Sequence, residues 1–414
     1  MDFDLTDEQV MLRDTVRDLL NRHYDPEKRL AVTATDLGWS REVWGQLAEL
    51  GVLGLSFAEK DGGMDAGPVE TMLVLEEFGR RLAPEPLLDA VLVPGGLISA
   101  IGTADQRQRI LPEVAAGSKL LAFAHGEPGT RWPNHTIETT ATAQGDGYTL
   151  TGVKNPVPHG DCADELVVSA KLPGGGLGLF LVAAEATGVT RAPYATVDSL
   201  RGAQVEFAGA PAELLGTVED AAATVDEVLV QAQAGLCAES IGAMEEALRL
   251  TTEYLKTRKQ FGVTLSKFQT LTQRAANMYV SLELARSMSY YLTAALVDSP
   301  GDAVIASRAR LQVGRSARHI GQEAIQMHGG IGVTSEYPVS HYAARLTAIE
   351  RTLGSGLEHL RILTARVGDY AQPEQPAHLG IGELMEIAVG TAHPGQGRRC
   401  VRAHHLVGFG AQPR

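Results

Sequence analysis

The chain has 414 residues, of which 44% are hydrophobic and 21% charged, and this composition is typical of a folded protein built from two or three packed units. Its formal net charge of −14 excludes nucleic acid and anionic membranes as partners, so an anionic cofactor would need local donors. The acidic N-terminus, the lack of a long apolar run and the three scattered cysteines predict a cytoplasmic protein with no membrane segment, no disulfide framework and no metal site.

The first part of the chain, residues 1 to about 115, has the pattern of helices. Thr6 with Gln9, and Thr103 with Gln106, have the spacing of capping boxes, and apolar residues follow each pair at intervals of three or four positions. We therefore expect an N-terminal helical domain over residues 1–115.

The middle part, residues 116–222, changes to the pattern of strands. Short β-prone runs at Tyr148–Thr151, Glu165–Ser169 and Gly178–Val182 are separated by glycine-rich turns. This stretch predicts a β domain.

Long helical patterns return over residues 223–368, with Ala, Leu and Met on one face and charged residues outside. After this segment the chain is interrupted by Pro373 and Pro376, and residues 369–414 are predicted to be an appended, flexible tail that contributes little to the fold.

Two motifs in the C-terminal helical part indicate an anion site. In Gln326–Pro338 a helical pattern ends at Gly329 and Gly330, where backbone N–H groups can approach an anion without a Cβ in the way. In the run that follows Tyr254, Arg258 offers a planar fork of donors suited to a pyrophosphate, and Phe261 adds a flat apolar surface. Either motif alone is equally typical of a simple helix end, but together they predict half of a dinucleotide site.

Both motifs resemble signatures of the acyl-CoA dehydrogenase family, and Glu59–Gly63 and Lys267–Gln269 match further family motifs. The resemblance covers residues 1 to about 368 and is greatest to the small subunits of two-component acyl-CoA dehydrogenases of the pimeloyl-CoA type. It implies an α+β multidomain fold with an N-terminal helical domain, a middle β barrel and a C-terminal four-helix bundle. It also implies FAD as cofactor, with Arg258, Phe261, Gln269, Gln326, Gly329 and Gly330 as cofactor-binding residues.

The resemblance further implies that a carboxylate removes the α-proton of an acyl-CoA thioester while the flavin accepts the β-hydride. The sequence departs from the family here, because the usual glutamate is replaced by Leu353 and the alternative base position holds Ala232. Glu239 is the remaining candidate, since it shares a helical face with Ala232 and Ala243 that is expected to border the acyl slot. The alternative is that Glu239 pairs with an arginine at a domain or subunit contact.

The residues expected around the flavin ring also differ from the family. Trp132 replaces a serine that contacts CoA, and Pro156 and Pro158 replace a tryptophan and a threonine of the ring site. Proline has no N–H to donate, so His125 and His159 are the candidate substitute donors; the alternative for each is an ordinary surface or core histidine.

In the tetramers of this family each flavin lies across a dimer interface. A chain that keeps the pyrophosphate residues but lacks the base is therefore predicted to complete the flavin site of a second acyl-CoA dehydrogenase subunit, with electron-transfer flavoprotein as the electron acceptor. The alternatives are an FAD-binding homotetramer with another base, a non-catalytic scaffold, and a flavin oxidase or monooxygenase. The small side chains between Ala232 and Ala243 suggest a roomy slot for a long, branched, dicarboxylic or polycyclic acyl group in lipid catabolism.

Overall fold

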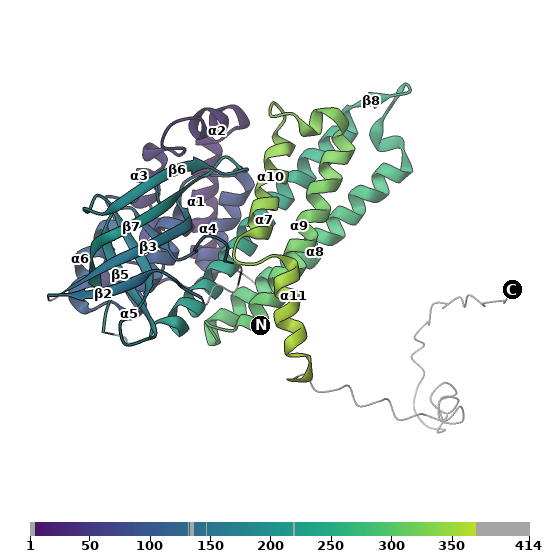
Figure 1. Ribbon diagram of the computed structural model, residues 1–414. Coiled ribbons are helices and arrows are strands. Elements are labelled where there is room, and N and C mark those ends of the chain that lie inside the picture. Colours follow the sequence, from purple (N-terminus) through teal and green to yellow (C-terminus); the bar gives the residue numbers. More distant parts are fainter. Residues whose placement is uncertain (1–4, 131, 133–135, 146, 218–219, 370–414) are drawn as a thin grey trace, which may run out of the picture. The chain divides into compact units, whose positions relative to one another are not determined.

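The computed structural model describes residues 5–130, 132, 136–145, 147–217 and 220–369 (Figure 1). The described residues up to Ala365 form one compact unit. The predicted tail lies outside the described residues, apart from residue 369.

Helices fill the N-terminal part of the compact unit. Both predicted capping boxes are present: Thr6 and Gln9 exchange backbone and side-chain hydrogen bonds before the first helix, and Thr103 and Gln106 do so before the last. The elements are α1 (Asp7–His23), α2 (Pro26–Thr33), α3 (Arg41–Glu49), η1 (Val52–Gly54), η2 (Glu59–Asp61), α4 (Pro68–Arg81), the π-helix η3 (Leu87–Leu92), α5 (Val93–Ile101) and α6 (Ala104–Ala115).

Strands fill the middle part and close into the predicted barrel. The strands are β1 (Leu121–Ala124), β2 (Thr140–Gln144), β3 (Gly147–Pro158), β4 (Glu165–Lys171), β5 (Leu177–Ala183), β6 (Val189–Ala195) and β7 (Arg201–Leu214). The strand β4 pairs with β5, β5 with β7, β7 with β3, β3 with β2 and β2 with β4, which forms a closed ring. The remaining strands extend it, because β1 pairs with β4 and β6 pairs with β7.

Long helices return after the barrel. They are α7 (Ala222–Thr257), α8 (Gln269–Asp298), α9 (Ala303–His328), α10 (Pro338–Arg351) and α11 (Gly356–Ala365), with short elements β8 (Lys259–Gln260), β9 (Val263–Thr264), η4 (Leu265–Lys267), η5 (Gly329–Val333) and η6 (Val367–Asp369). A tight turn at Phe261 and Gly262, both with positive φ, joins β8 to β9. None of the helices in the described part of the chain has the length and hydropathy needed to cross a membrane.

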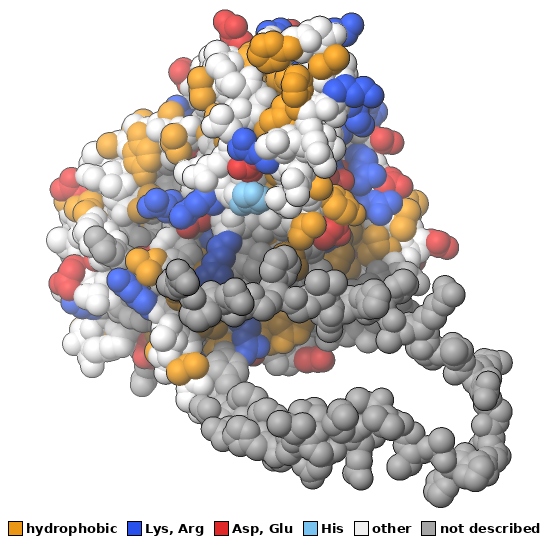
Figure 2. All heavy atoms as spheres, turned by 90° about the vertical axis from the view of Figure 1, so that its right-hand side faces the viewer, with side chains coloured by type: hydrophobic (Ala, Val, Ile, Leu, Met, Phe, Trp, Pro, Cys, Tyr) orange, Lys and Arg blue, Asp and Glu red, His pale blue; other side chains and the backbone are white. Residues whose placement is uncertain are grey.

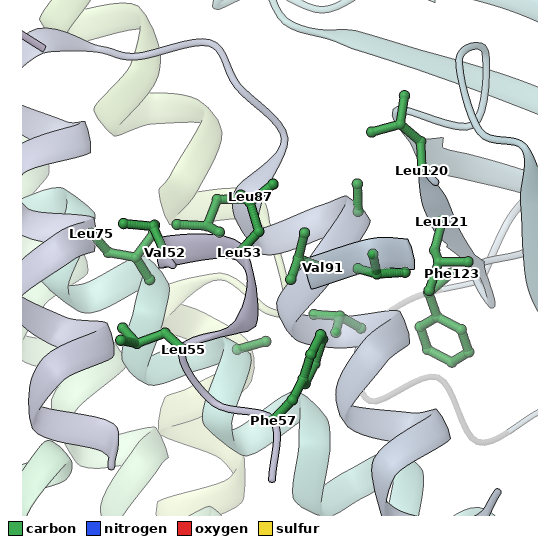
Figure 3. Close-up of a cluster of buried hydrophobic side chains, with 14 of the residues drawn as sticks. Val52, Leu53, Leu55, Phe57, Leu75, Leu87, Val91, Leu120, Leu121 and Phe123 are labelled. Carbon is green, nitrogen blue, oxygen red and sulfur yellow. The ribbon is translucent and has the colours of Figure 1, made fainter. Parts of the chain in front are cut away.

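A continuous hydrophobic core joins the N-terminal helices to the barrel (Figure 3). Leu53 and Phe57 from the segment around η1, and Leu87 and Val91 from η3, gather beside residues of β1, of which Leu121 is fully buried. This shared core holds η3 against β1, and the two elements border the chamber described next.

Candidate active site

A chamber of about 820 Å³ lies where the N-terminal helices, the barrel and the C-terminal helices meet. Its walls are largely apolar, with a few polar groups, as in ligand pockets generally. The residues that line it include Asp89 and Val93 from the N-terminal helices, Phe123, His125, Pro156 and Pro158 from the barrel, and Ala232, Leu236 and Leu353 from the C-terminal helices.

The turn between α10 and α11 places Leu353 in the chamber wall. Leu353 has a φ of 51°, which is unusual for a residue with a Cβ and is held by its surroundings. The buried Arg310 guanidinium donates to the carbonyl oxygens of Ile349 at 2.7 Å and Thr352 at 2.6 Å, and the His359 Nε2 lies 3.1 Å from the carbonyl oxygen of Leu353. These hydrogen bonds fix the turn. The side chain at its chamber position is the hydrocarbon of Leu353, where the family resemblance implies a proton acceptor.

The other base position is also apolar, because Ala232 lines the chamber and is 3% exposed. One turn further on, the side chain of Leu236 lines the chamber as well. Glu239 does not continue this wall. Its two carboxylate oxygens accept hydrogen bonds from Arg345 of α10, at 2.6 and 2.7 Å.

The Glu239 carboxylate is thus held in an ion pair that also involves Asp198, whose carboxylate accepts from the Arg345 Nη1 at 2.7 Å. A carboxylate with both oxygens engaged by a guanidinium has little capacity left to accept a proton from a substrate. Of the two roles considered for Glu239, the geometry favours the ion pair, which lies within the C-terminal helices and reaches the barrel through Asp198.

Gly242, in the run of small residues near Glu239, serves helix packing and does not line the slot, whereas Ala232 at the start of that run lines the chamber. A Cβ placed on Gly79 of α4 would lie 1.9 Å from the carbonyl oxygen of Glu239, and one placed on Gly242 would lie 1.9 Å from that of Glu76. Only glycine allows α4 and α7 to cross at this distance. The face that borders the chamber therefore ends near Leu236.

Two carboxylates that the sequence analysis did not single out line the chamber, Asp89 and Glu358. The Glu358 carboxylate accepts the backbone N–H of Ser355 at 2.7 Å, close to the start of α11. Burial raises the pKa of Asp89 to about 6, and its Oδ2 lies 3.9 Å from the Nε2 of His159. In the sequence, Asp89 stands out only as an isolated aspartate in the apolar run Leu87–Leu92. Helix propensity alone would place such a residue on the surface of a helix.

The two histidines predicted as flavin donors have different places. His125 lines the chamber, where its ring stacks on Phe123 with centroids 5.1 Å apart and its Nδ1 lies 2.9 Å from the Ser169 hydroxyl. His159 is 2% exposed and lies behind Asp89, outside the residues that line the chamber. Burial lowers the pKa of His159 to about 3, so its imidazole is neutral.

The predicted pyrophosphate residues lie on the outer surface. Arg258, Phe261, Gln269, Gln326, Gly329 and Gly330 are all exposed. The two motifs are joined by Tyr254, whose ring stacks on His328 with centroids 4.5 Å apart. A Cβ added at Gly329 or Gly330 would meet no heavy atom within 4 Å, so a ligand can come close to this backbone, although the Gly329 N–H already donates to the carbonyl oxygens of Ile325 and Gln326.

This exposed set lies at one end of the helical bundle. Figure 1 places β8 at the far upper end of the bundle, away from α11, which borders the chamber. Figure 2 shows hydrophobic and Lys or Arg side chains side by side at that upper end. The residues that suit the nucleotide end of FAD are therefore separate from the chamber of the same chain.

The site residues fit FAD only in part. The exposed arginine and the open glycine backbone suit a pyrophosphate that approaches from another molecule. In the chamber, Pro156 and Pro158 provide neither an N–H nor a hydroxyl to the position where the resemblance implies the flavin ring.

Helical domains on either side of a barrel, with an apolar chamber where they meet, define the acyl-CoA dehydrogenase class of fold. The family model for the N-terminal domain of acyl-CoA dehydrogenases matches residues 6–118, and the model for the C-terminal domain matches residues 223–368. The chain belongs to the acyl-CoA dehydrogenase family, a family of FAD-dependent oxidoreductases.

Relatives and solved structures agree with this assignment. The chain is 30% identical over 365 residues to the acyl-CoA dehydrogenase IpdE2 of Mycobacterium tuberculosis, covering 87% of this chain and 98% of the relative. It is 27% identical over 371 residues to the acyl-CoA dehydrogenase FadE27 of the same organism, covering 87% and 97%. Among solved structures it is similar to the ChsE4–ChsE5 complex from Mycobacterium tuberculosis, with a TM-score of 0.81 and 26% identity over 90% of this chain and all of the matched one.

Proposed function

We propose that this chain is a subunit of an FAD-dependent acyl-CoA dehydrogenase and that it completes the flavin site of a second, base-bearing subunit. One observation carries the proposal: both base positions in its own chamber, Leu353 and Ala232, are hydrocarbon, while the nucleotide-binding set at the end of the bundle is exposed.

The reaction is the α,β-dehydrogenation of an acyl-CoA thioester to the 2-enoyl-CoA. FAD supplies the acceptor for the β-hydride, and the partner subunit supplies the carboxylate that removes the α-proton. In this chain Arg258 binds the pyrophosphate through charged hydrogen bonds, and the backbone at Gly329 and Gly330 approaches the same phosphates. These groups position the cofactor and leave the chemistry to the partner's chamber.

Two further observations support a heteromeric assembly. The described part of α8 exposes large apolar side chains, including Tyr279, Val280, Leu284 and Val297, which are between 54% and 63% exposed and suit a subunit contact. The ChsE4–ChsE5 complex, to which the chain is similar, contains two different proteins. Electron-transfer flavoprotein is the proposed acceptor of the electrons.

A second candidate is an FAD-binding homotetramer that uses its own base. Asp89 favours this reading, because its carboxylate lines the chamber and burial raises its pKa to about 6, nearer to the working range of a general base. In that case Asp89→Asn would cost at least about 10²-fold in turnover by the isolated chain.

The experiment that separates the candidates is purification of the chain alone, with its mass in solution and its flavin content measured together. The subunit proposal predicts well under one flavin per chain, rising when a base-bearing acyl-CoA dehydrogenase chain is co-expressed. One tightly bound flavin per chain in a homotetramer would contradict it.

A further inference from the structure

The connection between β3 and β4 brings three metal-ligand side chains together outside the chamber. His159, Asp161 and Cys162 each offer a ligand atom, and these nitrogen, oxygen and sulfur atoms all lie within 4.8 Å of one another. The His159 side chain is 2% exposed and that of Asp161 is 8% exposed. No metal site was expected from the sequence, because the three cysteines have no metal-ligand spacing.

Two polar side-chain atoms of these residues have no hydrogen-bond partner in the described part of the chain. The Nδ1 of His159 and the Oδ1 of Asp161 are both buried and unpartnered. A buried polar atom left unpaired costs about 1–3 kcal/mol, and a ligand bound to both residues would remove that cost.

The second polar atoms of His159 and Asp161 face charged side chains. The other nitrogen of His159, Nε2, faces the Oδ2 of Asp89 at 3.9 Å. The other oxygen of Asp161, Oδ2, accepts from the Arg201 Nε at 3.0 Å. A histidine that binds a metal commonly points its second nitrogen at a carboxylate, which fixes the ring and leaves the first nitrogen to the metal.

The loop backbone is itself held in place. The Arg191 Nη1 donates to the carbonyl oxygens of Gly160 at 3.3 Å, Asp161 at 3.1 Å and Ala163 at 3.1 Å. The backbone that carries the three ligand residues is therefore fixed before any metal binds. Less conformational entropy is then lost when the metal binds.

We propose that His159, Asp161 and Cys162 form a binding site for a divalent transition metal of the zinc type. One nitrogen, one carboxylate oxygen and one sulfur are ligands that Zn²⁺ accepts in tetrahedral sites, whereas Mg²⁺ and Ca²⁺ prefer oxygen alone. On binding, the Cys162 thiol loses its proton to solvent and a sulfur–metal bond forms. The thiolate and the Asp161 carboxylate supply two negative charges, and the Arg201 guanidinium shares the second of them.

The proposed role of the metal is structural. Pro158, next to His159, lines the chamber, as does Asp89, which faces the His159 ring. The three ligands do not line the chamber themselves, so the metal would fix its wall from behind. Binding at this site is independent of FAD and of acyl-CoA.

The test is a cobalt titration of the full chain after chelator treatment and dialysis, without FAD or acyl-CoA. Co²⁺ replaces Zn²⁺ in tetrahedral sites and gives an absorption band when a thiolate is bound. We expect the band to saturate at one Co²⁺ per chain and to be abolished by added Zn²⁺. Cys162→Ser should remove the band, and Asp161→Asn should weaken Co²⁺ binding by about 10-fold or more.

The matched control is Cys400→Ser, because Cys400 lies near His404 and His405 in the sequence and is the rival source of a thiolate site. This variant should keep the band and its stoichiometry. The proposal is wrong if the unsubstituted chain shows no thiolate band, a result that needs no variant to fold. It is also wrong if the band survives Cys162→Ser or is lost in Cys400→Ser.

Discussion

Arg345 holds Glu239 through two hydrogen bonds, 2.6 Å from Nε to Oε1 and 2.7 Å from Nη2 to Oε2, and its Nη1 bonds to Asp198 at 2.7 Å. The cluster joins α10, α7 and the connection between β6 and β7. A carboxylate that sequence reasoning considered as a base is therefore part of a contact between the barrel and the helices.

The ion pair makes a prediction about stability. Arg345→Leu leaves the buried carboxylates of Glu239 and Asp198 without their cation, and we expect the free energy of unfolding to fall by about 3–5 kcal/mol. Denaturant unfolding of the purified variant measures the change. A loss below about 1 kcal/mol, the range of an exposed pair, would show that the cluster is not closed to solvent.

Glu239→Gln tests the same residue for catalysis. We expect turnover by the assembled enzyme, per folded protein, to stay within about 10-fold of the unsubstituted value, because Glu239 is paired and does not line the chamber. Removal of a general base would cost at least about 10²-fold. A loss of that size with unchanged flavin content would make Glu239 the base.

The pyrophosphate contact is tested by Arg258→Ala. Loss of a charged hydrogen bond should weaken FAD binding to the assembly by about 1.5–3 kcal/mol, roughly 10- to 150-fold in Kd. Flavin released on dilution, followed by fluorescence, measures the effect. Lys256→Ala, an exposed cation two residues earlier, is the control and should retain FAD. Equal flavin retention by both variants would exclude the contact.

The raised pKa of Glu76 predicts that the free energy of unfolding depends on pH. This carboxyl is fully enclosed by α4 and its neighbours, and burial raises its pKa from 4.5 to about 7. The folded state then binds more protons than the unfolded state, so the stabilising effect of protonation is present below pH 4.5 and is lost as the pH rises through 7.

Glu76→Gln removes this titration. The stability of the variant relative to the unsubstituted protein should therefore increase with pH, by up to about 1.4 kcal/mol per pH unit between about pH 5 and 7. Unfolding curves at several pH values measure the difference. The exposed Glu49→Gln should show no such trend. If the difference in stability between Glu76→Gln and the unsubstituted protein does not change with pH, the Glu76 carboxyl is solvated.

The tail prediction remains open to experiment. Residues 1–365 form a compact unit with its own core, so deletion of residues 370–414 should leave the unfolding midpoint unchanged. Limited proteolysis of the full chain should remove this segment first. Protection of the segment equal to that of the helical core would show that it docks.

The sequence predicted the fold well because local signals agreed with one another. The capping boxes at Thr6 and Thr103 and the paired glycines after His328 mark element ends through backbone chemistry that neighbouring residues determine. The absence of the usual base at Leu353 was also readable, because a motif fixes that position along the chain.

The environment of single side chains was not readable in the same way. Glu239 meets Arg345 across 106 residues of sequence, and no local pattern specifies that meeting. His159 was interpreted as a flavin donor, but the barrel turns it behind Asp89 and towards Asp161. The small side chains between Ala232 and Ala243 were interpreted as space for substrate, but Gly242 lies against α4, which comes from a distant segment of the chain.

The most direct test of the subunit proposal is flavin reduction by an acyl-CoA under nitrogen, compared between the chain alone and the chain co-purified with a base-bearing acyl-CoA dehydrogenase subunit. Leu353 offers no proton acceptor, so we expect no bleaching of any flavin that the chain alone retains, and stoichiometric bleaching in the two-chain assembly. Bleaching of one flavin per subunit by the chain alone would contradict the account.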